Sequence, residues 1–193
     1  MVDFEAQNVR YIRISSSGST VDGNAVIQEI TAQYDTAKNF AIASRGTTVI
    51  PASGLTGAEN LIDGYDYMNG SYGYGFVPAT QTETLTPFGT IDLGQVRNIN
   101  EVGLHLWDGD ARAYYNYKVE VSTNNTDWTT VFDGTDEPGT NYQGLQTVAF
   151  EAQNVRYIRI SLSGNTVNYG AHITEVTARL VPEPSATPTT VLT

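Results

Sequence analysis

One segment of twelve residues occurs twice in this chain. Residues 4–15 read FEAQNVRYIRIS, and residues 150–161 repeat them letter for letter. The match continues beyond this segment, and 21 of 31 positions are identical between 4–34 and 150–180. Because a compact domain does not need its last strands at both ends, the chain reads as the tail of one module followed by a complete module. Repetition at the length of a whole domain indicates modules in series rather than a solenoid, whose repeats run to about 20–50 residues.

The repeat divides the chain into four segments. Residues 1–34 form a partial repeat, the terminal hairpin of a preceding or partner module, and residues 35–38 form a linker. Residues 39–181 form the complete domain. Residues 182–193 are rich in proline and threonine, so we expect an extended tail there.

The composition predicts a globular all-β domain. Hydrophobic residues make up 40% of the chain, charged residues only 16%, and 18 glycines supply turns. Alternating apolar segments separated by Gly, Asn, Asp and Pro predict strands at Phe40–Ser44, Thr90–Leu93, Ile99–Trp107, Tyr115–Ser122, Thr129–Phe132, Gln146–Phe150, Val155–Leu162 and Ile173–Leu180. We expect an eight-stranded jelly-roll sandwich, with an extra N-terminal hairpin copied from the domain's last strands.

Charge and motifs exclude several classes of function. The net charge of −11 would repel a phosphate backbone, which argues against nucleic-acid binding, and it would repel an anionic membrane surface as well. The chain has no cysteine, so it holds neither disulfides nor thiolate metal sites. It also has no G-x-S-x-G, H-E-x-x-H or P-loop motif. We therefore expect a protein that is not an enzyme.

Three anchors in order resemble the discoidin domain, also called the coagulation factor 5/8 type C domain. They are N-x-I-D-G at residues 60–64, the V-x-V-S hairpin with its tryptophan at residues 119–128, and RYIRI at residues 156–160. The stretch LHLWDGDARAYYNYKVEVS especially resembles the discoidin domains of some BTB/POZ and bacterial surface proteins. The resemblance implies an eight-stranded jelly roll with its ligand loops at one end. It also implies a binding activity, toward sugars, lipid headgroups, collagen or other proteins.

The loop IDGYD at residues 62–66 is a candidate calcium site. Hard cations such as Ca²⁺ prefer six to eight oxygen ligands. The resemblance implies a structural Ca²⁺ held by Asp63, Asp66 and, from the last strand, Glu175. The alternative is that Asp63 caps a turn and Glu175 makes an ordinary hydrogen bond.

Five aromatic residues crowd the glycine-rich stretch at residues 65–76. Sugars present apolar C–H faces that stack on aromatic rings, so a loop of this kind suits a glycan. Tyr72 and Tyr74 are the candidates that face a ligand. The alternative is that these rings pack as a lid on the sandwich.

The polar loop WDGDAR supplies four further ligand-binding candidates, Trp107, Asp108, Asp110 and Arg112. The planar guanidinium of Arg112 could donate to a sugar hydroxyl or carboxylate, or it could pair with either aspartate and hold the loop. His172 is a candidate because the partial repeat has Val26 in its place, so the scaffold does not require histidine there.

The sequence therefore predicts an extracellular, non-catalytic binding or adhesion module. We expect it to bind a glycan or cell-surface polysaccharide, to be stabilised by Ca²⁺, and to act in a tandem or multivalent array. The alternative is a structural subunit of a surface fibre or layer, in which residues 1–34 mediate head-to-tail self-association.

Overall fold

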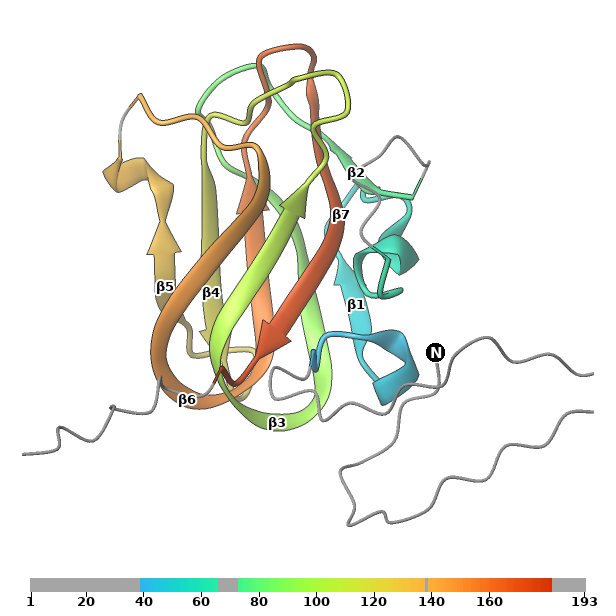
Figure 1. The fold of residues 1–193 in the computed structure, drawn as a ribbon, viewed down its shortest axis with the longest axis vertical. Coiled ribbons are helices and arrows are strands. Elements are labelled where there is room, and N and C mark those ends of the chain that lie inside the picture. Colours follow the sequence, from blue (N-terminus) through green and yellow to red (C-terminus); the bar gives the residue numbers. More distant parts are fainter. Residues whose placement is uncertain (1–38, 66–72, 138, 182–193) are drawn as a thin grey trace, which may run out of the picture. The chain divides into compact units, whose positions relative to one another are not determined.

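The computed structural model describes residues 39–65, 73–137 and 139–181 (Figure 1). The predicted partial repeat, linker and tail lie outside the described residues, as do the site candidates Asp66 and Tyr72. Seven strands and three short 3-10 turns make up the fold: η1 (Ala43–Arg45), β1 (Thr48–Pro51), η2 (Ala58–Leu61), β2 (Gly75–Pro78), β3 (Thr86–Leu106), β4 (Tyr117–Ser122), β5 (Thr129–Asp133), η3 (Gly134–Asp136), β6 (Gly144–Leu162) and β7 (Gly170–Arg179).

The two long strands, β3 and β6, bend and thereby connect two layers. In the first layer the order is β1–β3–β6–β4–β5, formed by the N-terminal arm of β3 and the C-terminal arm of β6. In the second it is β2–β7–β3–β6, formed by the opposite arms. The pairing register shifts between Asp92 and Arg97, where Gly94 adopts φ +75°. Figure 1 shows both ribbons turning at the bottom of the view. The all-β, jelly-roll prediction is confirmed.

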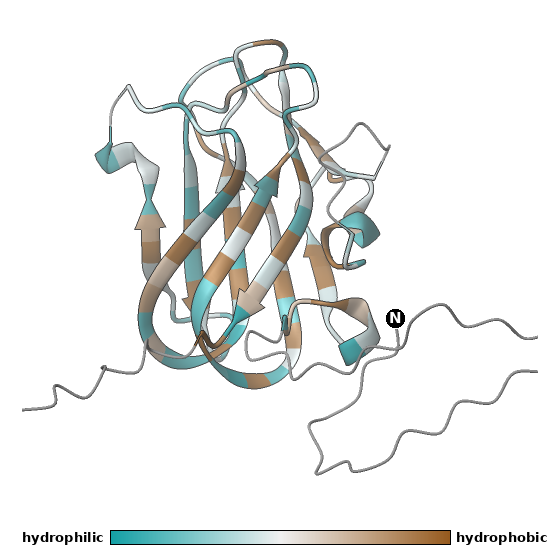
Figure 2. Cartoon of the chain, viewed as in Figure 1, coloured by the Kyte–Doolittle hydropathy of each residue, from teal (hydrophilic) through white to brown (hydrophobic). Residues whose placement is uncertain are grey.

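The core lies between the two layers and is built by alternation along the bent strands. Because successive side chains of a strand point to opposite faces, every second residue faces inward. The alternation of hydrophobic and hydrophilic residues along the ribbons is visible in Figure 2. The largest fully buried side chains of β3, β6 and β7 are Phe88, Ile91, Leu93, Ile99, Leu104, Leu106, Ile158, Ile160, Leu162 and Ile173.

The segment before β2 covers the outer face of β7. Every residue of β7 from Gly170 to Ala178 is buried, on both faces of the strand. The amide of Phe40 donates to the carbonyl of Ala178 over 2.7 Å. The strand predicted at Phe40–Ser44 is wrong, because the chain turns into η1 and closes at Gly46, whose φ is +83°. The chain around η1 therefore packs on the sheet without joining it, whereas β1, which follows, pairs with β3.

Four connections gather at one end of the sandwich, because both arms of β3 and both arms of β6 rise to that end. They are residues 79–85, 107–116, 134–143 and 163–169, with residue 138 outside the described set. They lie at the top of Figure 1, opposite the bends. Gly164 packs directly against the backbone carbonyl of Thr80, which fixes the β6–β7 loop on the β2–β3 connection. This loop end carries most of the predicted ligand residues.

Candidate functional site

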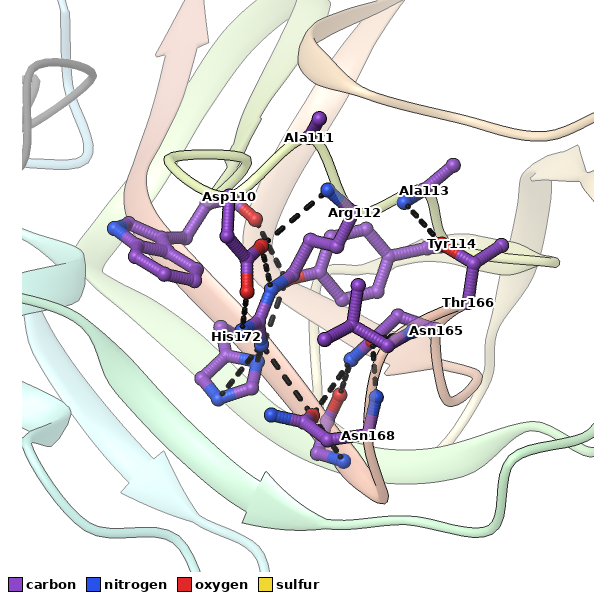
Figure 3. Close-up of polar contacts among 12 residues, drawn as sticks. Asp110, Ala111, Arg112, Ala113, Tyr114, Asn165, Thr166, Asn168 and His172 are labelled. Atoms are coloured by element: carbon purple, nitrogen blue, oxygen red, sulfur yellow. Dashed lines mark hydrogen bonds and ion pairs between the residues drawn. The ribbon is translucent and has the colours of Figure 1, made fainter.

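A buried arginine organises the loop between β3 and β4. Arg112 is only 4% exposed, and its Nε and Nη2 donate to the two carboxylate oxygens of Asp110 over 2.7 and 2.6 Å (Figure 3). Between them, Ala111 adopts φ +62°, an uncommon conformation for a residue other than glycine. The hydrogen bonds from Arg112 hold the pKa of the Asp110 carboxyl below its usual value. Asp108 closes the same loop through its carbonyl, which accepts from the amide of Ala111 over 2.8 Å.

His172, in β7, lies against this arginine and is neutral. Nη1 of Arg112 is 3.0 Å from Nδ1 of His172. Because a guanidinium only donates, the imidazole nitrogen that it contacts accepts. Nδ1 is nearer to Nη1 than Nε2, which lies 3.4 Å away, and we therefore assign Nδ1 as the acceptor and the proton to Nε2. The imidazole is 5% exposed, and its burial, together with the charge of Arg112, lowers the pKa of His172 to about 4. The hydroxyl of Tyr114 lies 3.3 Å from the same Nδ1 and donates to the carbonyl of Trp107 over 2.8 Å.

Aromatic rings surround His172. The ring centroids of Tyr74 and Phe76 each lie 5.1 Å from that of the imidazole, and the centroid of Trp107 lies 5.8 Å away. The guanidinium carbon of Arg112 stands 4.2 Å from the centre of the Trp107 ring, and the backbone of Gly109 packs on the same indole. Trp107 is thus held by atoms of its own loop, and Tyr74 joins it from the segment before β2.

The β6–β7 loop completes the cluster and is fixed by Asn165, which is fully buried. Its Oδ1 accepts from the amides two and three residues ahead, over 2.8 and 2.9 Å. Its Nδ2 donates to the side-chain oxygen of Asn168 over 3.0 Å, and that oxygen also lies 3.4 Å from Nη1 of Arg112 (Figure 3). The next residue, Tyr169, is 70% exposed. The loop therefore links the buried cation to an exposed aromatic ring.

The assembled cluster suits a polar ligand with an apolar face. The side chain of Asp110 is 39% exposed and offers carboxylate acceptors at the rim. The exposed Asn168 offers an amide, and Tyr169 offers a ring. Since the charge of Arg112 is already compensated by Asp110, the site presents paired donors and acceptors rather than a free positive charge.

The calcium candidates lie on a different loop from the arginine cluster. Asp63 caps a turn, with its Oδ1 accepting from the amide of Tyr65 over 2.8 Å. Gly64 follows with φ +85°, and its amide donates to Oε2 of Glu175 over 3.3 Å. Glu175 is 3% exposed. The fold thus brings the Asp63 loop to the carboxylate of Glu175. Among the described residues, there is no group of three or more His, Cys, Asp or Glu side chains that could hold a metal ion.

Several members of the arginine cluster were missed by sequence reasoning. Tyr114, Asn165, Asn168 and Tyr169 are absent from the predicted set. A signal for three of them exists in the repeat, where the positions of Asn165, Asn168 and Tyr169 carry Ser19, Asp22 and Gly23.

Comparisons with known proteins agree with this fold. The family model of the F5/8 type C domain matches residues 42–176. BTB/POZ domain-containing protein 9 of Rattus norvegicus is 38% identical over 136 residues, which are 70% of this chain and 21% of the relative. Its Homo sapiens counterpart is 35% identical over the same shares. The chain therefore spans about a fifth of the length of these relatives.

Solved structures of CBM32 modules are similar as well. One is the CBM32 of AlyQ in complex with 4,5-unsaturated mannuronic acid, 27% identical, with a TM-score of 0.51 over 68% of this chain and 92% of that chain. Another, from Clostridium perfringens in complex with GlcNAc-α-1,4-galactose, is 18% identical, with a TM-score of 0.54 over 76% and 96%.

Among the described residues, no helix is long and apolar enough to span a membrane. The bent-strand sandwich, the ligand-loop end and the family match all describe the same architecture. The chain belongs to the F5/8 type C, or discoidin, domain family.

Proposed function

We propose that this chain is a non-catalytic glycan-binding module whose ligand is a neutral sugar held at the loop end of the sandwich. The observation that carries the proposal is the Arg112 cluster: a buried cation neutralised by Asp110, fixed by His172 and Asn168, and adjacent to the exposed ring of Tyr169. Sugars need such a mixture, because their hydroxyls both donate and accept while their C–H faces stack on aromatic rings.

The electrostatics of the cluster favour a neutral sugar over an acidic one. Arg112 is the only cation of the cluster described here, and the bidentate contact with Asp110 compensates its charge. The whole chain carries a net charge of −11, which adds repulsion toward a carboxylate ligand. The related AlyQ module was solved with an unsaturated uronic acid. We infer that the present chain does not favour an acidic sugar of that kind.

Tyr169 and Tyr74 supply the aromatic part of the proposed site. Tyr169 is the more exposed, and it directly follows Asn168, whose oxygen lies 3.4 Å from Arg112 Nη1. Cα atoms of consecutive residues are about 3.8 Å apart, so one sugar ring can contact both positions. Tyr72, which lies outside the described residues, stays a candidate from the sequence.

We further propose that a Ca²⁺ ion has a structural role at the loop that faces Glu175. Support comes from the nearly buried Glu175 carboxylate, which the fold holds against the turn that begins at Asp63. Carboxylate oxygens are ligands that Ca²⁺ prefers, and the turn at Asp63 places backbone and side-chain oxygens beside this carboxylate. Asp66, from the same loop, would supply a further oxygen.

In its biological setting, we propose that the module is displayed outside the cell, in series with others of its kind. The repeat of residues 4–15 at residues 150–161 supports an array, in which weak single sites gain by effective concentration. The same repeat favours a second candidate function, a self-assembling subunit that uses residues 1–34. Light scattering with and without residues 1–35 separates these functions, since only the assembling subunit loses its polymers on deletion.

A glycan array followed by calorimetric titration tests the main proposal. The wild-type chain should bind neutral glycans. Tyr169→Ala should weaken that binding at least tenfold with an unchanged melting temperature, because the side chain is exposed. Asn168→Ala should weaken it as well, with a lower melting temperature, since the Asn168 side-chain oxygen accepts from Arg112 and Asn165. Val96→Ala is the matched control, because Val96 is 49% exposed at the bend of β3, at the opposite end of the sandwich. A folded wild-type chain that binds no neutral glycan, or variants that bind like the control, would contradict the proposal.

A further inference from the structure

The differences between the two copies of the repeat concentrate at the arginine cluster. Ten of the 31 compared positions differ, and five of these ten fall within the eight residues 165–172. In the order of the chain, Asn165, Asn168, Tyr169, Gly170 and His172 correspond to Ser19, Asp22, Gly23, Asn24 and Val26. The remaining three positions of this stretch are identical in the two copies.

Exposure does not explain this distribution. Asn165 is fully buried and His172 is 5% exposed, yet both differ from their counterparts. Thr166 and Val167 are exposed, and both are retained as Thr20 and Val21. Substitutions that accumulate without selection for function would fall at the exposed positions and spare the buried ones, because buried positions tolerate substitution least. The changed positions share instead their place in or beside the hydrogen-bonded network of Arg112.

Two of the changes would compensate each other if both were made in the described module. In the described module, Nη1 of Arg112 has two neutral acceptors, His172 Nδ1 at 3.0 Å and Asn168 Oδ1 at 3.4 Å. A valine at position 172 removes the first acceptor from a buried guanidinium, which is costly. An aspartate at position 168 replaces the second by a carboxylate, a stronger acceptor for a cation. The copy carries both changes together.

We propose that residues 165–172 are the specificity-determining element of the module, and that residues 19–26 encode an alternative version with a different ligand preference. Placed in the described module, the residues of this version would exchange an imidazole for a carboxylate as partner of Arg112. It also replaces the exposed ring of Tyr169 by glycine. An additional carboxylate and a lost ring disfavour stacking of neutral sugars and favour donor-rich ligands such as amino sugars. This inference rests on the proposed function, in that it takes the loop to contact a glycan.

The pairing is tested in the full chain by a thermal double-mutant cycle that needs no ligand. His172→Val alone should lower the melting temperature by roughly 5 °C, since Arg112 loses an acceptor. Adding Asn168→Asp should recover at least half of that loss, whereas the same change in the wild-type background should not stabilise. Additive losses in the cycle would overturn the pairing.

The specificity is tested by transplanting the copy's residues. The chain with Asn165→Ser, Asn168→Asp, Tyr169→Gly, Gly170→Asn and His172→Val is compared with the wild type on an array of neutral, uronic-acid and amino-sugar glycans. If this chain is poorly folded, the double variant and Tyr169→Gly replace it. We expect at least a tenfold loss for the neutral glycans and a relative gain for amino sugars. Val167→Ala, at a retained exposed position of the same loop, should keep the wild-type profile.

The outcomes separate this inference from the proposed function. A wild-type chain that binds no glycan refutes the proposed function, and with it the ligand part of the inference, while the thermal cycle still decides the pairing. A wild-type chain that binds neutral glycans, together with a folded transplant that keeps the same profile, overturns the specificity role of residues 165–172 alone.

Discussion

Nη1 of Arg112 lies 3.0 Å from Nδ1 of His172, so a buried cation donates to a neutral imidazole. The two residues come from different elements, the β3–β4 loop and the first part of β7. Their contact ties the β3–β4 loop to a strand that is buried on both faces. The protonation state of one side chain therefore affects both the stability of the fold and the geometry of the proposed ligand site.

Acidification should destabilise the protein between about pH 6.5 and pH 4 through His172. The folded pKa of about 4 is lower than the ordinary value of 6.5, so the unfolded chain takes up the proton first as the pH falls. The free energy of unfolding should therefore decrease over this window, by up to about 3 kcal/mol. Urea denaturation at pH 7 and pH 4.5 measures the decrease, and His172→Gln should make it smaller.

Three aspartates with a lowered pKa affect stability at a lower pH than His172 does. Hydrogen bonds from Arg156, Arg112 and Thr135 lower the pKa of the carboxyls of Asp92, Asp110 and Asp133 below 3.8, so their stabilisation is lost only at lower pH. His105→Gln serves as the control. Equal pH dependence in the wild type and in His172→Gln would show that the imidazole does not carry the effect.

Asp110 and Asp108 should respond differently to the same substitution. Asp110→Asn removes the charge that compensates a guanidinium with 4% exposure, and we expect a loss of about 1–2 kcal/mol at pH 7, moderated by the partial exposure of the Asp110 side chain. Asp108 holds its loop through a backbone carbonyl, so Asp108→Asn should change stability by less than about 0.5 kcal/mol. Equal losses in urea denaturation would contradict the assignment of Asp110 as the partner of Arg112.

The layered β architecture was predictable because its strands alternate clearly. The predicted strands at Ile99–Trp107 and Val155–Leu162 lie within β3 and β6 to within one residue. Sequence reasoning did not join them to their neighbours, because the bends after Asp92 and near Gln153 interrupt the alternation. It missed β1 and β2 because each has only four residues and ends in proline, where an edge strand cannot be told from a loop.

The site was predictable in part, for a different physical reason. Residue types placed Asp110 and Arg112 among the candidates, and the difference from the partial repeat placed His172 there. Periodicity, however, does not show which loops meet at one end of a sandwich. That depends on the long-range pairing of β3 with both β6 and β7. The role of Asn165 was not visible either, because a buried asparagine that fixes a loop has the same local sequence as an ordinary turn.

A side chain at Gly164 should loosen the ligand end. Its Cβ would collide with the backbone carbonyl of Thr80, so the β6–β7 loop and the β2–β3 connection would have to separate. We expect Gly164→Ala to cost about 2–3 kcal/mol in urea denaturation and to weaken glycan binding. Gly46→Ala is the control, since Gly46 has φ +83° but no atom near its added Cβ, and strain alone costs about 1 kcal/mol. A larger loss at Gly46 would contradict the close packing at Gly164.

Calcium, if bound as proposed, should stabilise the fold through Glu175. Adding Ca²⁺ at about 1 mM to chelator-treated protein should raise the melting temperature by several degrees. A ligand that binds only the folded state raises the free energy of unfolding by mass action, by about 2.7 kcal/mol when its concentration is one hundred times the dissociation constant. Glu175→Gln should abolish this rise, since the neutral amide is a much weaker ligand for a hard cation. Glu59→Gln, at an exposed position of η2, should keep the calcium-dependent rise in melting temperature.

Asn168→Ala should also keep this calcium response while it loses glycan binding, because the two sites lie on different loops. A calcium response that survives Glu175→Gln would place the ion elsewhere, and no response in the wild type would remove the ion from the proposal.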